Sequence, residues 1–342
     1  MAELRGGLIG CGFFSITHLH GWNGVVGANI VAICDRDPAR LALLGDQFGV
    51  AARYLDAAEM LAKENLDFVD IATPPPSHRA LVELAARKGV GVICQKPIAI
   101  SLEDARAMVE ICDRSAVPLM IHENFRWQTP IQAVRAAIES GAIGAPFWGR
   151  ISFRSAYDVF CGQPYLATGE RFIIEDLGIH ILDIARFLFG DVARMTARTR
   201  RVNPAIRGED VATMLLDHES GVTSIVDCSY ATRLAVEAFP ETLVEVDGTG
   251  GSIRLNQGYE LVVVDERRAH GRDVSPTLLP WASRPWHHIQ ESVQSIQQHW
   301  VDCLRGGKSP ATSGTDNLKT FALVEAAYRA TKSGGPIELS EL

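Results

Sequence analysis

The sequence predicts an α/β protein with two domains: an N-terminal Rossmann domain with a doubly wound parallel sheet, and a C-terminal α+β domain with an open, mostly antiparallel sheet. The chain has 342 residues, more than one hydrophobic core usually supports. Up to about residue 121, short apolar runs alternate with helical patterns, as in a parallel sheet covered on both faces. After residue 130, segments of alternating polarity follow one another instead. We therefore expect a dinucleotide-binding domain over 1–123 and a substrate-binding and oligomerisation domain over 124–342.

The elements of the first domain follow from its apolar runs and from the residues that begin helices. The runs expected to form parallel strands are 7–10, 30–34, 68–72, 91–94 and 119–121. Amphipathic segments between them are expected to form helices over 39–48, 78–88 and 102–114. These helices follow residues that favour a helix start, namely Pro38, Ser77 and Ser101.

The second domain begins with a helix after Pro130 and a long strand-like run over 147–157. An apolar helix is expected over 177–188. Alternating segments then predict strands over 193–201, 211–216, 223–230, 242–246 and 260–264. Two late helices, over 285–304 and 317–332, are expected to pack back across the domain junction.

The composition excludes several classes of protein. With 41 acidic and 33 basic side chains the net charge is -8, and no basic run could follow a nucleic acid backbone. No apolar stretch reaches the ~20 residues that span a bilayer, and the chain enters a glycine-rich turn too early for a secretory signal. We expect a cytoplasmic protein without nucleic acid or membrane partners. The seven cysteines are scattered without CxxC spacing, which predicts reduced thiols and no metal site.

A glycine-rich turn, Gly10-Cys11-Gly12-Phe13-Phe14-Ser15, follows the first strand and opens a helix. In this context a G-x-G-x-x-G/A pattern indicates a dinucleotide site. Gly10 permits the tight turn, Gly12 lets the pyrophosphate approach the backbone, and Ser15 is small enough for close packing of helix and strand. Ser15 could also cap the helix, whose N-terminal amides would receive the phosphates.

Asp35 ends the second strand, where a carboxylate can accept hydrogen bonds from the adenine ribose hydroxyls. This favours NAD over NADP, because the same charge repels a 2′-phosphate. Arg36 could offset that repulsion. The alternative is that Asp35 only shapes a turn.

The motif Ala72-Thr73-Pro74-Pro75-Pro76-Ser77-His78 ends the third expected strand at the carboxyl edge of the sheet. Thr73 and Pro74 are therefore candidate cofactor contacts, and Ser77 is the expected N-cap of the next helix. His78 could contact the cofactor as well. Its alternative is an exposed histidine in the first helical turn.

Gln95-Lys96-Pro97 ends the next strand and places Lys96 at the same edge, which makes Gln95 and Lys96 candidate cofactor contacts. Oxidation of an alcohol requires the hydroxyl proton to leave, and an ammonium group stabilises the developing charge on the oxygen. The alternative is a solvated surface lysine.

Asp176 and His180 stand four residues apart at the start of the apolar helix and therefore share a helical face. The carboxylate could orient the imidazole and support its charged form, which would make His180 a general base. The alternative is a helix-terminal carboxylate beside a buried histidine. A metal site is not indicated, because no third ligand is evident.

Taken together, G-C-G-F-F-S, D-R, A-T-P-P-P-S-H, Q-K-P, N-F-R-W and E-D-L-G-I-H-I-L-D resemble the Gfo/Idh/MocA family of sugar and cyclitol dehydrogenases. Their order and spacing match over essentially the whole chain. The resemblance implies a catalytic lysine at Lys96 and a catalytic Asp/His pair at Asp176 and His180. One departure is Gln95, where the family usually has glutamate. We expect the backbone role of this position to survive without the electrostatic effect of that glutamate on Lys96.

The same resemblance implies that Asn124 and Arg126 contact substrate hydroxyls; their alternative is a polar crossover between domains. Tyr157, Gln163 and Tyr165 lie in a polar, aromatic loop that could line a sugar pocket or serve an oligomer contact.

The sequence thus predicts an NAD-dependent dehydrogenase that oxidises a hydroxyl of an aldose or polyol, with NADP as the less favoured cofactor. The alternatives left open are an inositol or other sugar dehydrogenase, a reductase, an NAD-dependent glycosidase, and a non-catalytic dinucleotide sensor. One face of an open sheet must be covered, and a second copy of the chain is a common cover. This predicts a homodimer or homotetramer.

Overall fold

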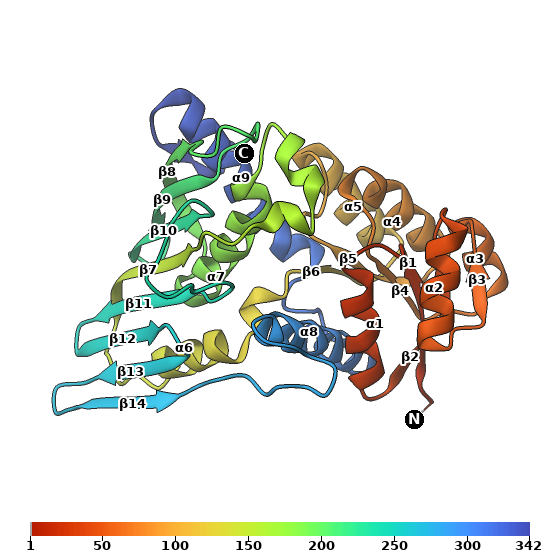
Figure 1. The fold of residues 1–342 in the computed structure, drawn as a ribbon, viewed down its shortest axis with the longest axis horizontal. Coiled ribbons are helices and arrows are strands. Elements are labelled where there is room, and N and C mark those ends of the chain that lie inside the picture. Colours follow the sequence, from red (N-terminus) through yellow and green to blue (C-terminus); the bar gives the residue numbers. More distant parts are fainter. Residues whose placement is uncertain (1) are drawn as a thin grey trace. The chain divides into compact units, whose positions relative to one another are not determined.

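The protein is described by a computed structural model of residues 2–342; residue 1, which opens the first expected domain, lies outside the described residues. The chain divides into two compact units (Figure 1). The first unit contains the chain up to Asn124 together with Gln290–Leu318, and the second contains Phe125–Ile289 and Lys319–Leu342. The expected division instead gives all residues after 123 to the second domain.

The first unit is built on a six-stranded sheet with the order β3-β2-β1-β4-β5-β6, in which every pairing is parallel. This is the doubly wound order of dinucleotide-binding domains, and its direction reverses between β1 and β4. The strands are β1 (Leu4–Ile9), β2 (Ala28–Cys34), β3 (Ala52–Tyr54), β4 (Phe68–Ile71), β5 (Gly91–Gln95) and β6 (Leu119–His122). The sequence prediction did not include β3, which has two partly buried residues and one exposed residue.

The helices of this unit connect successive strands. They are α1 (Ser15–Gly24), α2 (Pro38–Phe48), α3 (Ala57–Lys63), α4 (His78–Arg87) and α5 (Leu102–Arg114). Asp37, Asp56 and Ser101 cap α2, α3 and α5 through their side-chain oxygens. Ser77 holds the expected N-cap position of α4 but makes no capping hydrogen bond. Its hydroxyl is instead bonded to Thr73 Oγ1 and Pro74 O.

Helix α8 (His287–Gly306) belongs to the first unit from Gln290 onward. Trp300 on this helix is fully buried, and its ring centroid lies 6.3 Å from that of Phe68 on β4. Phe68 in turn lies 4.8 Å from Trp22 on α1. These aromatic contacts explain why the segment joins the first unit, since apolar burial determines where an amphipathic helix packs.

The second unit is built on a nine-stranded sheet with the order β14-β13-β12-β11-β7-β10-β9-β8-β15 (Figure 1). Its pairings are antiparallel except for β10 with β7. The strands are β7 (Pro146–Arg154), β8 (Val192–Arg200), β9 (Val211–His218), β10 (Thr223–Ser229), β11 (Leu243–Gly248), β12 (Gly251–Asn256), β13 (Glu260–Val264), β14 (Ala269–Asp273) and β15 (Ile337–Glu338). The sequence prediction did not include β12, β14 or β15.

Helices cover one face of this sheet. They include α6 (Thr129–Glu139), which contacts β12 and β13, and α7 (Ile179–Phe189), which contacts β7 and β10. Helix α9 (Gly314–Ser333) belongs to this unit from Lys319 onward. A π-helical turn (Ile174–Gly178) leads directly into α7. Over residues 2–342, no helix combines the length and apolarity that a bilayer crossing demands.

Candidate active site

The glycine-rich turn has the backbone that its sequence predicts. Gly10 has a φ of 104°, and a Cβ atom there would lie 2.7 Å from Ala72 O, so only glycine fits. Gly12 differs, because a Cβ there would meet no atom within 4 Å. The backbone at Gly12 therefore faces open space beside the N-terminus of α1, where a pyrophosphate can approach.

The Ser15 hydroxyl forms a hydrogen bond within the turn and does not cap the helix. Helix α1 begins at Ser15, and the residue at its N-cap position is Phe14. The buried Ser15 hydroxyl accepts a hydrogen bond from Gly12 N at 3.1 Å. The expectation of a Ser15 cap is therefore wrong, because the hydroxyl is already turned back toward the loop. Phe13 is 65% exposed at the outside of the turn.

Asp35 connects the end of β2 to the glycine-rich turn. Its Oδ2 atom accepts a hydrogen bond from Cys11 N at 2.6 Å, and its Oδ1 atom accepts one from Asp37 N at 2.8 Å. Each carboxylate oxygen has a second lone pair that can accept a ribose hydroxyl. Arg36 is exposed next to it. The residues at this edge thus fit an adenosine ribose, as Gly10 and Gly12 fit a pyrophosphate.

The loop after β4 lies against the glycine-rich turn. Thr73 Cγ2 would be 2.9 Å from a Cβ at Gly10, which places Thr73 at the point where the strand order reverses. Pro74 follows it and is exposed. Thr73 and Pro74 therefore stay candidate cofactor contacts at the edge where open α/β sheets bind ligands.

His78 is fully buried, so the alternative of an exposed first-turn histidine is wrong. Its Nε2 and Nδ1 atoms lie 2.7 Å from Thr73 O and 3.1 Å from Ile98 O. Burial lowers the pKa of the imidazole. The ring joins the loops that follow β4 and β5, and a direct contact of His78 with the cofactor stays a prediction.

Lys96 follows the last residue of β5 and is half-buried. Its backbone amide donates a hydrogen bond to Gln95 Oε1 at 2.7 Å. Strands β5 and β4 are adjacent and parallel, so Lys96 leaves the sheet at the same edge as Thr73. The first unit thus brings together the phosphate turn, the ribose carboxylate and the candidate catalytic lysine.

The second unit holds Asp176 and His180 on consecutive turns. Asp176 lies in the π-helical turn and His180 in the first turn of α7. Single π turns occur often at functional sites. The His180 ring is 5% exposed and stacks on Phe125, with centroids 3.9 Å apart and planes inclined by 4°. Burial raises the pKa of Tyr230, and the nearby charge of Asp176 raises it further.

Arg126 is buried beneath α7 and paired with Asp183. Its Nε atom donates to Asp183 Oδ2 at 2.6 Å, its Nη2 atom donates to Oδ1, and Thr320 adds a third hydrogen bond to this carboxylate. Asn124, in the first unit, donates to Ser292 Oγ at 2.7 Å. These contacts support a positioning part for both residues, and their contact with substrate stays a prediction. Sequence reasoning did not find Asp183, although a carboxylate inside an apolar helix signals a buried partner.

We expect Asp183→Leu to lower the free energy of unfolding by about 3–5 kcal/mol, because it removes the carboxylate that accepts two hydrogen bonds from the buried Arg126 guanidinium. Urea unfolding of the wild type and the variant measures this difference. The double variant R126M/D183L removes both charges and should recover most of the loss. A single variant as stable as the wild type would show that the pair contributes nothing.

The aromatic loop of the second unit keeps its predicted residues near the surface. Tyr157 stacks on Phe239 with ring centroids 3.8 Å apart. The Tyr165 hydroxyl donates to Gln163 Oε1 at 2.7 Å, and Tyr165 is 66% exposed. The part of these residues in a sugar pocket stays a prediction.

The residues that the structure describes hold no cluster suited to a metal ion, and the two cysteines nearest the glycine-rich turn have unreactive thiols. Among residues 2–342, no group of three or more His, Cys, Asp or Glu side chains could hold a metal ion. Cys161 is exposed, while burial raises the pKa of the Cys11 and Cys34 thiols to about 12. Thiols of that pKa remain protonated and are poor nucleophiles near neutral pH.

Comparison with known proteins matches both halves of the chain. The family model described as an oxidoreductase family with an NAD-binding Rossmann fold matches residues 4–123, and the Gfo/Idh/MocA C-terminal domain matches residues 131–254. The chain is 65% identical to a D-apiose dehydrogenase of Rhizobium rhizogenes, covering 100% of this chain and 99% of the relative. It is 63% identical to a D-apiose dehydrogenase of Paraburkholderia graminis, covering 99% and 91%.

A solved structure has the same fold throughout. A crystal structure of an oxidoreductase from Agrobacterium radiobacter, in complex with NAD+, L-tartaric acid and magnesium, matches with a TM-score of 0.99 at 65% identity, covering 99% of each chain. The predicted fold class is confirmed by this match and by the family models. The chain therefore belongs to the Gfo/Idh/MocA family of oxidoreductases, and its first unit is an NAD-binding Rossmann domain.

Proposed function

We propose that the protein is an NAD-dependent dehydrogenase that oxidises D-apiose at its anomeric carbon to the lactone. The observation that carries this proposal is the full-length identity of 65% and 63% to two D-apiose dehydrogenases. The first unit supports it with a turn that fits a pyrophosphate and a lysine at the same edge of the sheet. The second unit supports it with Asp176 in the π-helical turn that leads into α7 and His180 in the first turn of α7.

Each of these side chains has a defined part in the proposed reaction. Bound NAD supplies the hydride acceptor. The Lys96 ammonium stabilises the negative charge that develops on the hydroxyl oxygen of the sugar. His180 takes the hydroxyl proton as general base, and the Asp176 carboxylate supports the imidazolium that results. The proposal requires Lys96 and His180 to reach the same hydroxyl group.

A panel of sugars tests the substrate. Pentoses including D-apiose, hexoses and cyclitols are each incubated with NAD and, in parallel, with NADP, and the absorbance of the reduced nicotinamide is followed. We expect the highest kcat/KM with D-apiose and NAD. Faster oxidation of another sugar would overturn the substrate assignment. No reduction with any sugar would indicate a sensor or a reductase, and sugar release from glycosides without net NADH would indicate a glycosidase.

We propose that Asp35 sets the preference for NAD through its carboxylate. Replacing it in Asp35→Ser removes the charge that repels a 2′-phosphate and an acceptor for the ribose hydroxyls. Hydrogen bonds to charged groups contribute about 1.5–3 kcal/mol, so we expect the ratio of kcat/KM for NAD over NADP to fall by roughly 10- to 100-fold. Parallel assays with the two cofactors measure this ratio, which cancels any general loss of activity. An unchanged ratio would remove Asp35 from cofactor selection.

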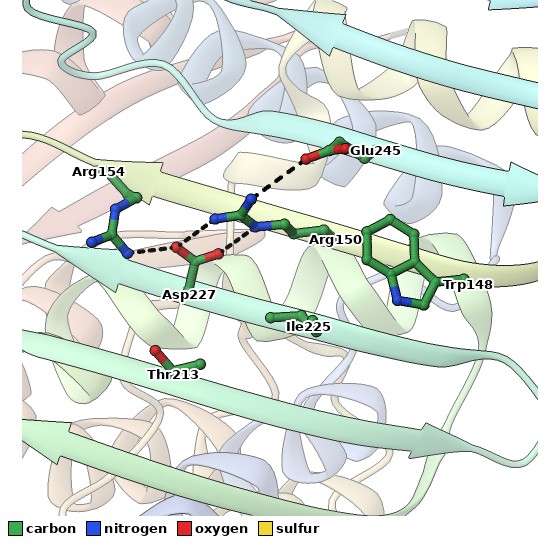
Figure 2. Close-up of a pocket in the computed structure, with 7 residues that line it drawn as sticks. All are labelled: Trp148, Arg150, Arg154, Thr213, Ile225, Asp227 and Glu245. Atoms are coloured by element: carbon green, nitrogen blue, oxygen red, sulfur yellow. Dashed lines mark hydrogen bonds and ion pairs between the residues drawn. The ribbon is translucent and has the colours of Figure 1, made fainter. Parts of the chain in front are cut away.

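We also propose that a second copy of the chain covers the sheet face opposite α6 and α7, giving a homodimer or homotetramer. Figure 2 shows a hollow on that face, whose charges are paired within it. Asp227 accepts hydrogen bonds at 2.8 Å from both Arg150 and Arg154, and Arg150 also pairs with Glu245 at 3.6 Å. The hollow is lined by Trp148, Arg150, Arg154, Thr213, Ile225, Asp227 and Glu245.

Because these charges are paired, another copy can cover this face without burying an isolated charge. A buried isolated charge would cost several kcal/mol. Light scattering of the purified protein measures its mass in solution. We expect the mass of a dimer or tetramer, and a smaller species for Ile225→Glu, which places a new charge in the hollow. A monomeric wild type would contradict the proposal.

A further inference from the structure

A buried polar cluster lies directly behind the segment that carries Lys96. His18 on α1 and Asp70 on β4 are both fully buried, and His18 Nδ1 lies 2.7 Å from Asp70 Oδ2. Trp22 Nε1 donates to the same oxygen at 2.7 Å. On its other side, His18 Nε2 lies 3.1 Å from Nε2 of Gln95, the residue before Lys96. The cluster therefore connects the backbone at Lys96 to a buried carboxylate.

The direction of each hydrogen bond from Lys96 through Gln95 and His18 to Asp70 follows from one fixed donor. The Lys96 backbone amide can only donate, so the Gln95 atom that faces it at 2.7 Å is the carbonyl oxygen Oε1. The Gln95 amide nitrogen then points to His18 and donates to its Nε2 atom. A ring nitrogen that accepts carries no proton, so the His18 proton is on Nδ1 and is donated to Asp70.

The surroundings of Asp70 agree with an ionised carboxylate beside His18. Burial raises the pKa of Asp70, but its interactions with His18 and His122 and the hydrogen bond from Trp22 outweigh this effect, and the net direction is downward. The titratable groups facing His18 are Asp70 from β4 and His122 from β6, whose ring stacks on it at 4.3 Å. From α8, the neutral Gln297 amide donates to His18 O.

We propose that Gln95 is a positioning residue for Lys96, which anchors the Lys96 backbone to the His18–Asp70 pair and keeps His18 neutral with its proton on Nδ1. The Gln95 side-chain nitrogen has its own hydrogen to donate to His18 Nε2. A glutamate carboxylate at this position has no such hydrogen and would have to share a proton with His18. The anchor is therefore independent of pH with glutamine and dependent on pH with glutamate. The catalytic consequence rests on the proposed dehydrogenase function, whereas the proton position and the anchor do not.

NMR on the protein labelled with 15N in its histidine rings and backbone tests the proton position without turnover. His18 is assigned by the signal that is lost in His18→Gln. We expect two widely separated ring-nitrogen shifts for His18 with the proton on Nδ1, and a Lys96 amide protected from hydrogen exchange. In Gln95→Met, Lys96 exchange should accelerate. Two similar ring-nitrogen shifts, a proton on Nε2, or unchanged Lys96 exchange in Gln95→Met would each overturn the proposal.

Kinetics of two variants test the consequence for catalysis. Gln95→Met removes both hydrogen bonds and should lower kcat by about 10-fold at every pH, because a hydrogen bond of about 1.4 kcal/mol no longer positions Lys96. Gln95→Glu should recover most of this loss at low pH, where the introduced carboxylate and His18 share a proton, and lose it again as the pH rises.

Equal pH profiles for the wild type and Gln95→Glu, at equal NADH affinity, would contradict the positioning role. If no sugar is oxidised by the wild type, the proposed function fails and the two NMR measurements still decide whether Gln95 anchors Lys96. If sugars are oxidised while His18 carries a proton on Nε2, the inference about Gln95 fails and the dehydrogenase stands. The two failures are therefore distinguishable.

Discussion

Replacing Lys96 with methionine lowers kcat for D-apiose oxidation by roughly 10²- to 10⁴-fold, the range expected when one group that stabilises or transfers charge in the transition state is lost. Methionine keeps the length of the side chain and removes the ammonium. Because this charge acts on the reacting oxygen, we expect the affinity for NADH to change little. Steady-state kinetics measure kcat, and NADH fluorescence titration measures the affinity.

The matched control for this variant is Lys88→Met, at the exposed C-cap of α4 in the same unit. It removes an equal charge away from the sheet edge and should turn over like the wild type. Equal activity of Lys96→Met and Lys88→Met would remove Lys96 from the mechanism. A loss confined to NADH affinity would instead make Lys96 a cofactor contact alone.

Replacing His180 with glycine lowers kcat by a similar factor of about 10²–10⁴, because the hydroxyl proton no longer has a positioned acceptor. The substitution leaves the space of the ring beside Phe125, where a free imidazole can stack. We therefore expect added imidazole to restore part of the activity in proportion to its concentration. Steady-state assays over a range of imidazole concentrations measure both effects.

His270→Gly on β14 serves as the control, since this histidine is exposed on an edge strand of the same unit. It should keep full activity and show no response to imidazole. Full activity of His180→Gly would exclude His180 as the base. A loss that imidazole leaves unchanged would point to a structural effect on α7, which urea unfolding detects separately.

The fold could be predicted where the sequence shows long periodic patterns. The prediction failed where elements are short or polar. Helix α5 was predicted with its observed bounds, because its apolar spacing is regular and Ser101 marks its start. Strand β3 has two partly buried residues and one exposed residue, and every side chain of β14 is exposed. Such strands exist through backbone pairing with a neighbouring strand, which a hydrophobic pattern does not record.

Contacts between distant residues account for what sequence reasoning did not find in the candidate site. The spacing of Asp176 and His180 is local and was visible, whereas His18 and Asp70 are 52 residues apart and were not linked. Gln95 was noted as a candidate cofactor contact and as a departure from the usual glutamate, but its hydrogen-bond partners required coordinates. The burial of His78 was not found for the same reason, because the two carbonyl groups that it contacts come from separate loops.

A crystal structure of the protein with NADH and D-apiose would measure most directly whether the lysine of the first unit and the histidine of the second act on one group. We expect Lys96 Nζ and His180 Nε2 each within about 2.6–3.2 Å of the same sugar hydroxyl, with the carbon that bears it facing the nicotinamide. A sugar bound by only one of these side chains, or a hydroxyl that neither reaches, would contradict the account.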